Sequence, residues 1–495
     1  METHRVSQCK ALLPIISGIV LCLTLPPIDI SFFVWVALVP LLFYISITES
    51  SKKVFWVGFL TGTIYAVKVL YPLSTLNSWW WTNPSGLLWN LRSEILVFFL
   101  FIVALYSGGL FFGLFSVLFK KCKRSPVVNM LLFPSIWVIF ELVREPLVLG
   151  FTWGHLGYAL HDSLYVAQIA SFGLVYGLSF IIVSINIGIF EIFDSTHTHL
   201  LKTRDAKGGL KPLLRHILRL PVFYFLTTLI VSILLFGTYS ISKNKQHSRT
   251  LRVAAIHMDI KTEDSRGVEA FNAYLSLIDD ALSHNPDLIV LPENTFPFFV
   301  IDQHTMLPLK YESTSSNIGK LFDELREHSL KHPKAAFIIG AHSTVTSTVH
   351  NSIIVLENGS TTDIYDKRRL MPFAEDASIL FGNETTKPFT KGDHNETVHA
   401  LGLHITPLIC SEIIFPLLSR HKSNDLIVNA SNDSVFDSKL VGLQNHYVAQ
   451  IRAIENKKFL IRSVKGGITS IIDPFGRTVV KKSGSRGVIV TDIAF

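Results

Sequence analysis

The sequence predicts a chain in two parts: a polytopic α-helical membrane domain with about seven spans, followed by a globular α/β domain. Apolar residues make up 49% of the 495 residues, and they are concentrated before about residue 250. Apolar stretches long enough to cross a bilayer recur in that first half. Beyond it, strand and helix patterns alternate as in a water-soluble protein. The predicted domains are residues 1–243 and 250–495.

Seven apolar stretches are candidate transmembrane helices, because a helix needs roughly 20 residues to cross the hydrocarbon core. They cover residues 11–27, 30–48, 54–71, 95–119, 127–143, 164–193 and 220–241. The first two are joined by a Pro-Pro-Ile-Asp turn and predict a helical hairpin. The second span follows at once and no small-residue cleavage pattern is present, so the first stretch is expected to be a retained anchor.

The basic residues are distributed asymmetrically between the loops. With the N-terminus in the cytoplasm, the inner segments hold 14 lysines and arginines, and the outer loops hold only Arg92 and Arg144. The positive-inside rule therefore predicts that the globular half lies outside, in the periplasm of a bacterium. Topology accounts for much of the net charge of +7, so no nucleic acid partner is expected. A tryptophan-rich segment, 77–89, is expected at the outer membrane surface.

Two ionisable residues near the end of the fifth span, Glu141 and Arg144, are expected to reach the headgroup region. They are three residues apart and so could pair on one helix face. A functional role at membrane depth is the alternative.

The second half has alternating strand and helix patterns, with hairpins, that predict a mixed α/β fold. Strands are predicted at 251–256, 287–291, 336–340, 352–356, 362–365, 403–409 and 426–429, and helices at 268–283, 318–328 and 442–456. An Asn-Gly pair at 358–359 predicts a hairpin turn, and a Pro-Phe-Gly sequence at 474–476 predicts another.

Cys410 stands alone in the globular half, because Cys9, Cys22 and Cys122 all belong to the membrane half. A disulfide framework is therefore not expected. A lone cysteine in a globular domain is a candidate nucleophile, and a buried inert thiol is the alternative.

Glu293 and Lys367 resemble Cys410 in position, since each of the three follows a predicted strand or hairpin. Strand ends are where α/β folds place reactive side chains. A carboxylate can take the proton of a thiol, and an ammonium can stabilise the oxyanion that forms when the thiolate attacks a carbonyl. Taken singly, Glu293 and Lys367 would be interpreted as solvated loop charges.

Three motifs carry a resemblance to a known family: Leu-Pro-Glu at 291–293, Asp-Lys-Arg-Arg-Leu-Met-Pro-Phe-Ala-Glu at 366–375 and Ile-Cys-Ser-Glu at 409–412. They resemble the motifs of the nitrilase superfamily, which implies an α-β-β-α sandwich. The preceding membrane half, with Pro-Pro at 26–27, Gly-Phe-Thr-Trp at 150–153 and Val-Tyr-Gly-Leu-Ser-Phe at 175–180, is similar to the apolipoprotein N-acyltransferase family.

The resemblance implies a role for each site residue. Glu293 would be the general base, Lys367 the oxyanion stabiliser and Cys410 the nucleophile. Glu375 and Glu412 would support the site, as would Ser411 where the family usually has tyrosine.

The resemblance also implies the substrates. An acyl chain would pass from a phospholipid, typically phosphatidylethanolamine, through a thioester to the N-terminal S-diacylglyceryl-cysteine of an apolipoprotein. No cofactor or metal is expected, because no histidine cluster has convincing ligand spacing.

The sequence departs from the family pattern at three further places. Val435 stands where the family has tryptophan, and Arg266 replaces another tryptophan in the loop after the first strand. The family has a closing transmembrane helix after the catalytic domain, whereas this sequence stops at Phe495.

Two alternative functions remain at this stage. A membrane-tethered amidase of the nitrilase type would use the same three residues on small amides, and a receptor or transporter would carry the domain without catalysis. The segment 296–311 is either a lid or a packed connection.

Overall fold

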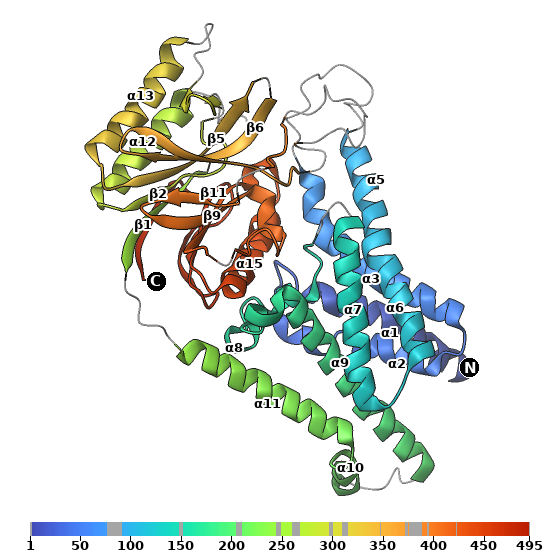
Figure 1. Cartoon of the computed structure of the whole chain (residues 1–495). Helices are drawn as coiled ribbons and strands as arrows, with labels where there is room; N and C mark the ends of the chain where they lie inside the picture. The colour runs from blue at the N-terminus through green and yellow to red at the C-terminus, as the bar shows by residue number, and fades with distance from the viewer. Residues whose placement is uncertain are drawn as a thin grey trace. The chain divides into compact units, whose positions relative to one another are not determined.

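The computed structural model consists of two compact units, Met1–Ser74 with Gly86–Lys243, and Thr75–Ser85 with Asn244–Phe495 (Figure 1). The structure describes residues 2–76, 92–147, 152–203, 210–243, 249–259, 268–296, 300–308, 315–346, 348–371, 375, 389–393, 396–421 and 423–494. The predicted tryptophan segment, 77–89, and Arg266 lie outside these residues. The second unit also takes in a short segment of the first half, because Leu76 forms a β-bridge with Phe436.

The first unit is helical, as predicted. Its elements are α1 (Glu2–Leu23), η1 (Ser31–Trp35), α2 (Val39–Ile47), α3 (Ser51–Leu70), η2 (Tyr71–Thr75), α5 (Arg92–Ala104), η3 (Leu105–Leu110), α6 (Phe111–Cys122), α7 (Pro126–Leu147), η4 (Leu156–Leu160), α8 (Leu164–Ala167), α9 (Ala170–Thr203), α10 (Leu210–Ile217) and α11 (Pro221–Ser242).

Within the described residues, five helices are long and apolar enough to cross a membrane. They cover Ser51–Thr75, Glu94–Cys122, Pro126–Glu145, Ala170–Leu200 and Pro221–Ser242. The first two predicted spans correspond to shorter apolar helices, Leu12–Leu23 and Ser31–Ile47. The helical membrane character is thus confirmed, and the count of seven spans stays a prediction.

Glycines let the central helices of this unit approach closely. A Cβ atom at Gly62 of α3 would lie 2.3 Å from the carbonyl oxygen of Gly108 in η3, and one at Gly58 would lie 2.2 Å from Ser116 Oγ of α6. Small residues that permit such contact are typical of helix packing in membranes, where lipid tails are as apolar as the side chains.

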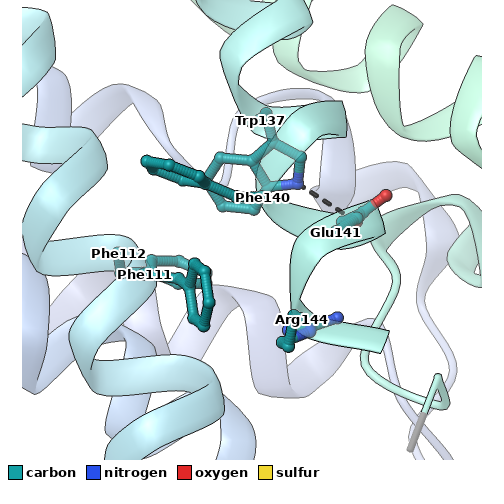
Figure 2. Close-up of a pocket in the computed structure, with 6 residues that line it drawn as sticks. All are labelled: Phe111, Phe112, Trp137, Phe140, Glu141 and Arg144. Carbon is teal, nitrogen blue, oxygen red and sulfur yellow. Dashed lines mark hydrogen bonds between the residues drawn. The ribbon is translucent and has the colours of Figure 1, made fainter. Parts of the chain in front are cut away.

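The expectation that Glu141 and Arg144 reach the headgroups is wrong: both are buried inside the unit, with exposures of 3% and 7%. Together with Phe111, Phe112, Trp137 and Phe140, they line a small, partly open pocket (Figure 2). Glu141 accepts hydrogen bonds from Trp137 Nε1 and from the backbone N–H of Leu156. These bonds converge on one oxygen of the carboxylate, Oε1, and tie the segment after α7 to that helix.

The second unit contains two β-sheets. Its strands are β1 (Thr250–His257), β2 (Leu288–Val290), β3 (Val300–Asp302), β4 (Leu307–Pro308), β5 (Ala336–Val345), β6 (Thr348–Glu357), β7 (Ser360–Asp366), β8 (Val398–Ala400), β9 (Leu403–Ile409), β10 (Leu426–Asn432), β11 (Leu460–Lys465), β12 (Thr469–Ile472), β13 (Thr478–Lys482) and β14 (Gly487–Ala494). Its helices are α12 (Val268–Ser283), α13 (Ser315–Lys331), η7 (Cys410–Ile414), η8 (Asp433–Val435) and α15 (Lys439–Asn456).

The first sheet has the order β14-β1-β2-β5-β3-β4, with β6 and β7 added through β5, and the second has the order β13-β12-β11-β10-β9-β8. Strands β1, β2 and β5 run parallel, and so do β9, β10 and β11. Parallel neighbours bring their carboxyl ends to the same edge of a sheet. The residues that follow these strands are therefore held near one another.

Two apolar layers hold this unit together, and β1 contributes to both. Val253 and Ala255 pack between the two sheets, while Ala254 and Ile256 pack under α12 with Tyr274. This alternation is the period of two expected for a strand that is buried on both faces. Helix α15 contacts β11 and β12 of the second sheet. The layers form an α-β-β-α sandwich, which confirms the predicted fold class.

Candidate active site

The structure brings together the three residues that the motifs singled out. Glu293 follows β2, Lys367 follows β7, and Cys410 follows β9 as the first residue of η7. Their exposures are 6%, 1% and 7%, so all three are buried in the second unit. The charge of Glu293 acts on the thiol of Cys410, so the two side chains are close neighbours. The first sheet supplies two of the three residues and the second sheet supplies the third.

Lys367 lies between two carboxylates. Its Nζ is 2.7 Å from Glu375 Oε2 and 3.5 Å from Glu293 Oε1. The side-chain amide of Asn351, on β6, donates to Glu293 Oε1 at 2.8 Å and to Glu375 Oε1 at 2.7 Å. One ammonium and one amide therefore hold both carboxylates in fixed positions. A buried ion pair with such additional hydrogen bonds meets the condition under which its desolvation is offset.

Sequence reasoning missed Asn351. It lies inside strand β6, Thr348–Glu357, and is only 3% exposed. A buried amide within such a strand needs hydrogen-bond partners, which is the signal that could have identified it.

Cys410 has a left-handed backbone conformation, with φ of 51°. Such a conformation in a residue with a Cβ costs on the order of 1–3 kcal/mol and has to be held by its surroundings. The side chain of Asn429, on β10, helps to hold it by donating to the carbonyl oxygens of Leu408 and Cys410 at 3.1 and 3.4 Å. The turn at the end of β9 thereby presents the thiol to Glu293.

Burial governs the protonation of the site. It raises the pKa of the Cys410 thiol, and the negative charge of Glu293 raises it further. Burial also raises the pKa of Glu293, against the opposing effect of Lys367. For Lys367, burial alone would lower the pKa, but Glu375 and Glu293 outweigh it and the pKa is raised. The resting site therefore holds a neutral thiol beside a charged ammonium, and a thiolate forms only if Glu293 accepts the proton.

Glu412 has a different environment from Glu293, because four donors saturate it. Its Oε1 accepts from the backbone N–H groups of Arg368 and Arg369 at 2.7 and 3.0 Å. Its Oε2 accepts from the N–H of Ile409 and the hydroxyl of Tyr365, both at 2.8 Å. Glu412 thus fastens the segment after Lys367 to the strand that ends at Cys410.

The other two supporting residues are also buried. Glu375 Oε2 accepts from the backbone N–H of Met371 at 2.7 Å, in addition to its contacts with Lys367 and Asn351. Ser411, 8% exposed, directly follows Cys410 in η7. Residues 372–374 of the second motif lie outside the described part of the chain.

In the described parts of segment 296–311, Phe296 and β3 pack on the first sheet, and the question of a lid stays open. Phe296 is buried against Phe271 and Tyr274 under the first sheet. Strand β3 then pairs with β5 in parallel and with β4 antiparallel. Residues 297–299 and 309–311 lie outside the described residues.

Both halves of the chain match known families. Residues 17–188 match the apolipoprotein N-acyltransferase N-terminal domain, and residues 252–495 match carbon-nitrogen hydrolase. The apolipoprotein N-acyltransferase of Geobacter metallireducens is 27% identical over 482 residues, which cover 94% of this chain and 85% of that protein. The protein of the same name from Pseudomonas syringae pv. tomato is 26% identical over 510 residues, 97% of this chain and 90% of that protein.

Among solved structures, a CN-hydrolase superfamily protein from Xanthomonas campestris is similar to half of the chain. It has a TM-score of 0.38 and 20% sequence identity, and the match covers 50% of this chain and 91% of that protein.

Proposed function

The chain belongs to the apolipoprotein N-acyltransferase family, and from this premise we propose that Cys410 carries an acyl group as a thioester between two lipid substrates. The chain is an acyltransferase of the nitrilase superfamily that acts in lipoprotein maturation. A single observation carries the proposed chemistry: Lys367 lies between Glu293 and Glu375, beside the buried Cys410 thiol on which the Glu293 charge acts.

The first half-reaction forms the acyl-enzyme. Glu293 takes the proton from Cys410 Sγ, and the thiolate attacks an ester carbonyl of the phospholipid. The oxyanion of the tetrahedral intermediate is stabilised by the Lys367 ammonium. When the intermediate collapses, the ester C–O bond breaks and Glu293 returns its proton to the departing oxygen. A lysophospholipid leaves, and the acyl chain remains on Cys410.

The second half-reaction regenerates the thiol. The acceptor is the α-amino group of the N-terminal S-diacylglyceryl-cysteine of an apolipoprotein. An α-amino group has a pKa near ~8, so a usable fraction is neutral at physiological pH. The amine attacks the thioester, and Glu293 takes the proton that the nitrogen loses as the amide bond forms. Collapse of the intermediate breaks the C–S bond, and the proton passes from Glu293 to the sulfur.

The membrane half fits substrates that reside in a bilayer. Its five long apolar helices and the family membership indicate a bacterial membrane protein. The positions of the basic residues support a cytoplasmic N-terminus and a periplasmic catalytic domain in the inner membrane. In that orientation both substrates reach the site from the outer leaflet. Phosphatidylethanolamine is the donor that we expect.

The membrane-tethered amidase is not favoured. It would use Glu293, Lys367 and Cys410 in the same way, but it gives no reason for an N-terminal half that matches the acyltransferase family over residues 17–188. Hydrolysis of small amides by the purified chain in the absence of lipid, without any acyl-enzyme from phospholipid, would reverse this preference.

The acyl-enzyme itself is the decisive observation. The full chain in detergent micelles is mixed with phosphatidylethanolamine of one defined acyl composition, and the intact protein is weighed by mass spectrometry. We expect a gain of one acyl mass, located on Cys410, with release of lysophospholipid. A diacylglyceryl-cysteine peptide should then discharge the adduct and become N-acylated.

Cys410→Ala is the matched control and should gain no mass. The proposal is contradicted if Cys410→Ala gains the same mass as the natural chain. It is equally contradicted if the natural chain gains none while the Geobacter metallireducens relative does so in the same micelles.

A further inference from the structure

A second buried lysine lies at the site, outside the three motifs. Lys465 is the last residue of β11 and is fully buried. Strand β11 packs against β1 and β2 of the other sheet (Figure 1). The Lys465 Nζ donates a hydrogen bond of 2.6 Å to the carbonyl oxygen of Asn294, the residue that directly follows Glu293. Its ammonium therefore reaches across from the second sheet to the turn that carries Glu293.

That turn is already held by other contacts. The backbone N–H of Thr295 donates to the carbonyl oxygen of Gly340 at 2.9 Å. The Thr295 hydroxyl donates to the carbonyl oxygen of Pro292 at 2.6 Å. A Cβ atom at Gly340 would lie 2.3 Å from the Pro292 oxygen, so β5 contacts the turn directly. A hydrogen bond from a neutral side chain would suffice as one more anchor. What distinguishes a lysine is its charge, which is costly to bury.

The charges around Glu293 give that ammonium a role. Glu293 interacts with Lys367 and Glu375, from the segment after β7, and with Cys410 of η7. Its charge also acts on Lys465 of β11, while Asn351 on β6 is neutral. Without Lys465 this group contains two carboxylates and one ammonium. With Lys465 it contains two of each, so the buried charges balance before any proton moves.

We infer that the Lys465 ammonium keeps the Glu293 carboxylate ionised, and thereby sets the lower end of the pH range in which Cys410 can be activated. Lys465 is a positioning residue, since it acts on the thiol through Glu293. The inference rests on the proposed function, because it requires Glu293 to be the base. Burial lowers the pKa of Lys465 to about 8, with Glu293 opposing that effect, so the side chain is charged at neutral pH.

The expected effect of removing the charge has a definite sign. A nearby cation lowers the pKa of a carboxyl group, so its removal raises the pKa of Glu293. Glu293 accepts the thiol proton only when it is ionised. When the rate of Cys410 alkylation is plotted against pH, the rise on the acidic side (the acidic limb) should therefore move to higher pH once Lys465 is replaced by a neutral residue.

Alkylation of the thiol by iodoacetamide tests this without any lipid substrate. The full chain in detergent micelles is labelled between pH 4.5 and 9, and modification at Cys410 is followed by peptide mass spectrometry. Lys465→Gln keeps a hydrogen-bond donor, and Lys465→Met keeps neither donor nor charge. In both variants we expect the acidic limb to move to higher pH by about one pH unit. This corresponds to about tenfold slower labelling on that limb. Lys481→Gln, which neutralises an exposed lysine of β13, should retain the natural profile.

The two variants separate charge from structure. An acidic limb in Lys465→Gln that coincides with that of the natural chain would overturn the inference, whatever the overall rate. Thermal unfolding of each variant checks that the labelling profile belongs to folded protein. If Lys465→Met does not fold, Lys465→Gln alone tests the inference.

Glu293→Gln separates this inference from the proposed function. It should slow labelling across the range and leave a rate that simply follows ionisation of the thiol, without the inflection that Glu293 produces. If the wild-type rate and inflection persist in Glu293→Gln, Glu293 is not the base, and both proposals fail. If the inflection is lost there but unmoved in both Lys465 variants, only the role of Lys465 fails.

Discussion

The two units both bury ionisable side chains, but they use them differently. In the helical unit, Glu141 accepts hydrogen bonds from Trp137, Leu156 and Ser179, and it joins parts of one helical bundle. In the sheet unit, Glu293 faces a thiol and an ammonium. The comparison teaches that burial alone does not indicate a reactive carboxylate. What matters is whether the carboxylate adjoins a nucleophile that it can activate by taking a proton, as Glu293 adjoins the Cys410 thiol.

The same contrast exists within the site. Glu412 and Glu293 are both buried, yet Glu412 accepts four hydrogen bonds that link two segments. We therefore expect substitution of Glu293 to affect the rate of acyl transfer, and substitution of Glu412 or Glu141 to affect mainly stability.

The largest effect is expected for Glu293→Gln. Loss of the general base should slow formation of the acyl-enzyme by roughly 10²–10⁴-fold, measured in single turnover with phosphatidylethanolamine. Glu141→Gln is the matched variant in the helical unit, since it also neutralises a buried carboxylate. At equal concentrations of folded protein, Glu141→Gln should form the acyl-enzyme at the same rate as the unsubstituted chain. Equal slowing in both variants would remove the distinction between the two units.

Lys367→Ala should slow acyl-enzyme formation by roughly 10²–10³-fold, because the oxyanion loses its stabilising ammonium. The carboxylates of Glu293 and Glu375 also lose their shared partner, so the pKa of Glu293 should rise and the acidic limb should move to higher pH. Single-turnover rates between pH 5 and 9 measure both effects. Acylation near the natural rate would exclude Lys367 as the oxyanion donor.

Glu412→Gln should destabilise the sheet unit, since an amide cannot accept at both ends as the carboxylate does. The donors left without an acceptor cost about 1–3 kcal/mol. Thermal unfolding of the detergent-solubilised chain measures the loss. The residual acylation rate should exceed that of Glu293→Gln, and the opposite order would make Glu412 a participant in the chemistry.

The smallest effect is expected in the helical unit. Gly62→Ala places a Cβ 2.3 Å from the Gly108 carbonyl and should cost roughly 1–3 kcal/mol by forcing α3 away from η3. Gly173→Ala is the control, because a Cβ there meets no atom of the described structure within 4 Å. Thermal unfolding should separate the two variants, and equal stability would indicate that the helices adjust without strain.

Much of the fold follows from local patterns. The predicted helix 268–283 coincides with α12, and the predicted strand 403–409 coincides with β9. The Asn-Gly turn at 358–359 joins β6 to β7, and both of its residues have positive φ. Each of these signals lies within a few adjacent residues, where side-chain period and turn chemistry determine the backbone.

Pairings between distant residues were not predictable in this way. Strand β14 returns to pair with β1 at sequence separations of 230 to 244 residues, from Thr250↔Ala494 to His257↔Gly487. Glu141 was expected at a span end and is buried, because its partners Leu156 and Ser179 come from segments beyond α7. No local period identifies such partners.

For the site, the sequence by itself determined which groups follow the strands: Glu293, Lys367 and Cys410, each at the end of an apolar run or hairpin. It also determined that a membrane half precedes them. Only the tertiary structure decided how these groups are charged and held, by placing Asn351 between two carboxylates and Lys465 against the turn after Glu293. The physical reason is that periodicity and turn chemistry act along the chain, whereas desolvation and charge pairing depend on which strand ends meet in space.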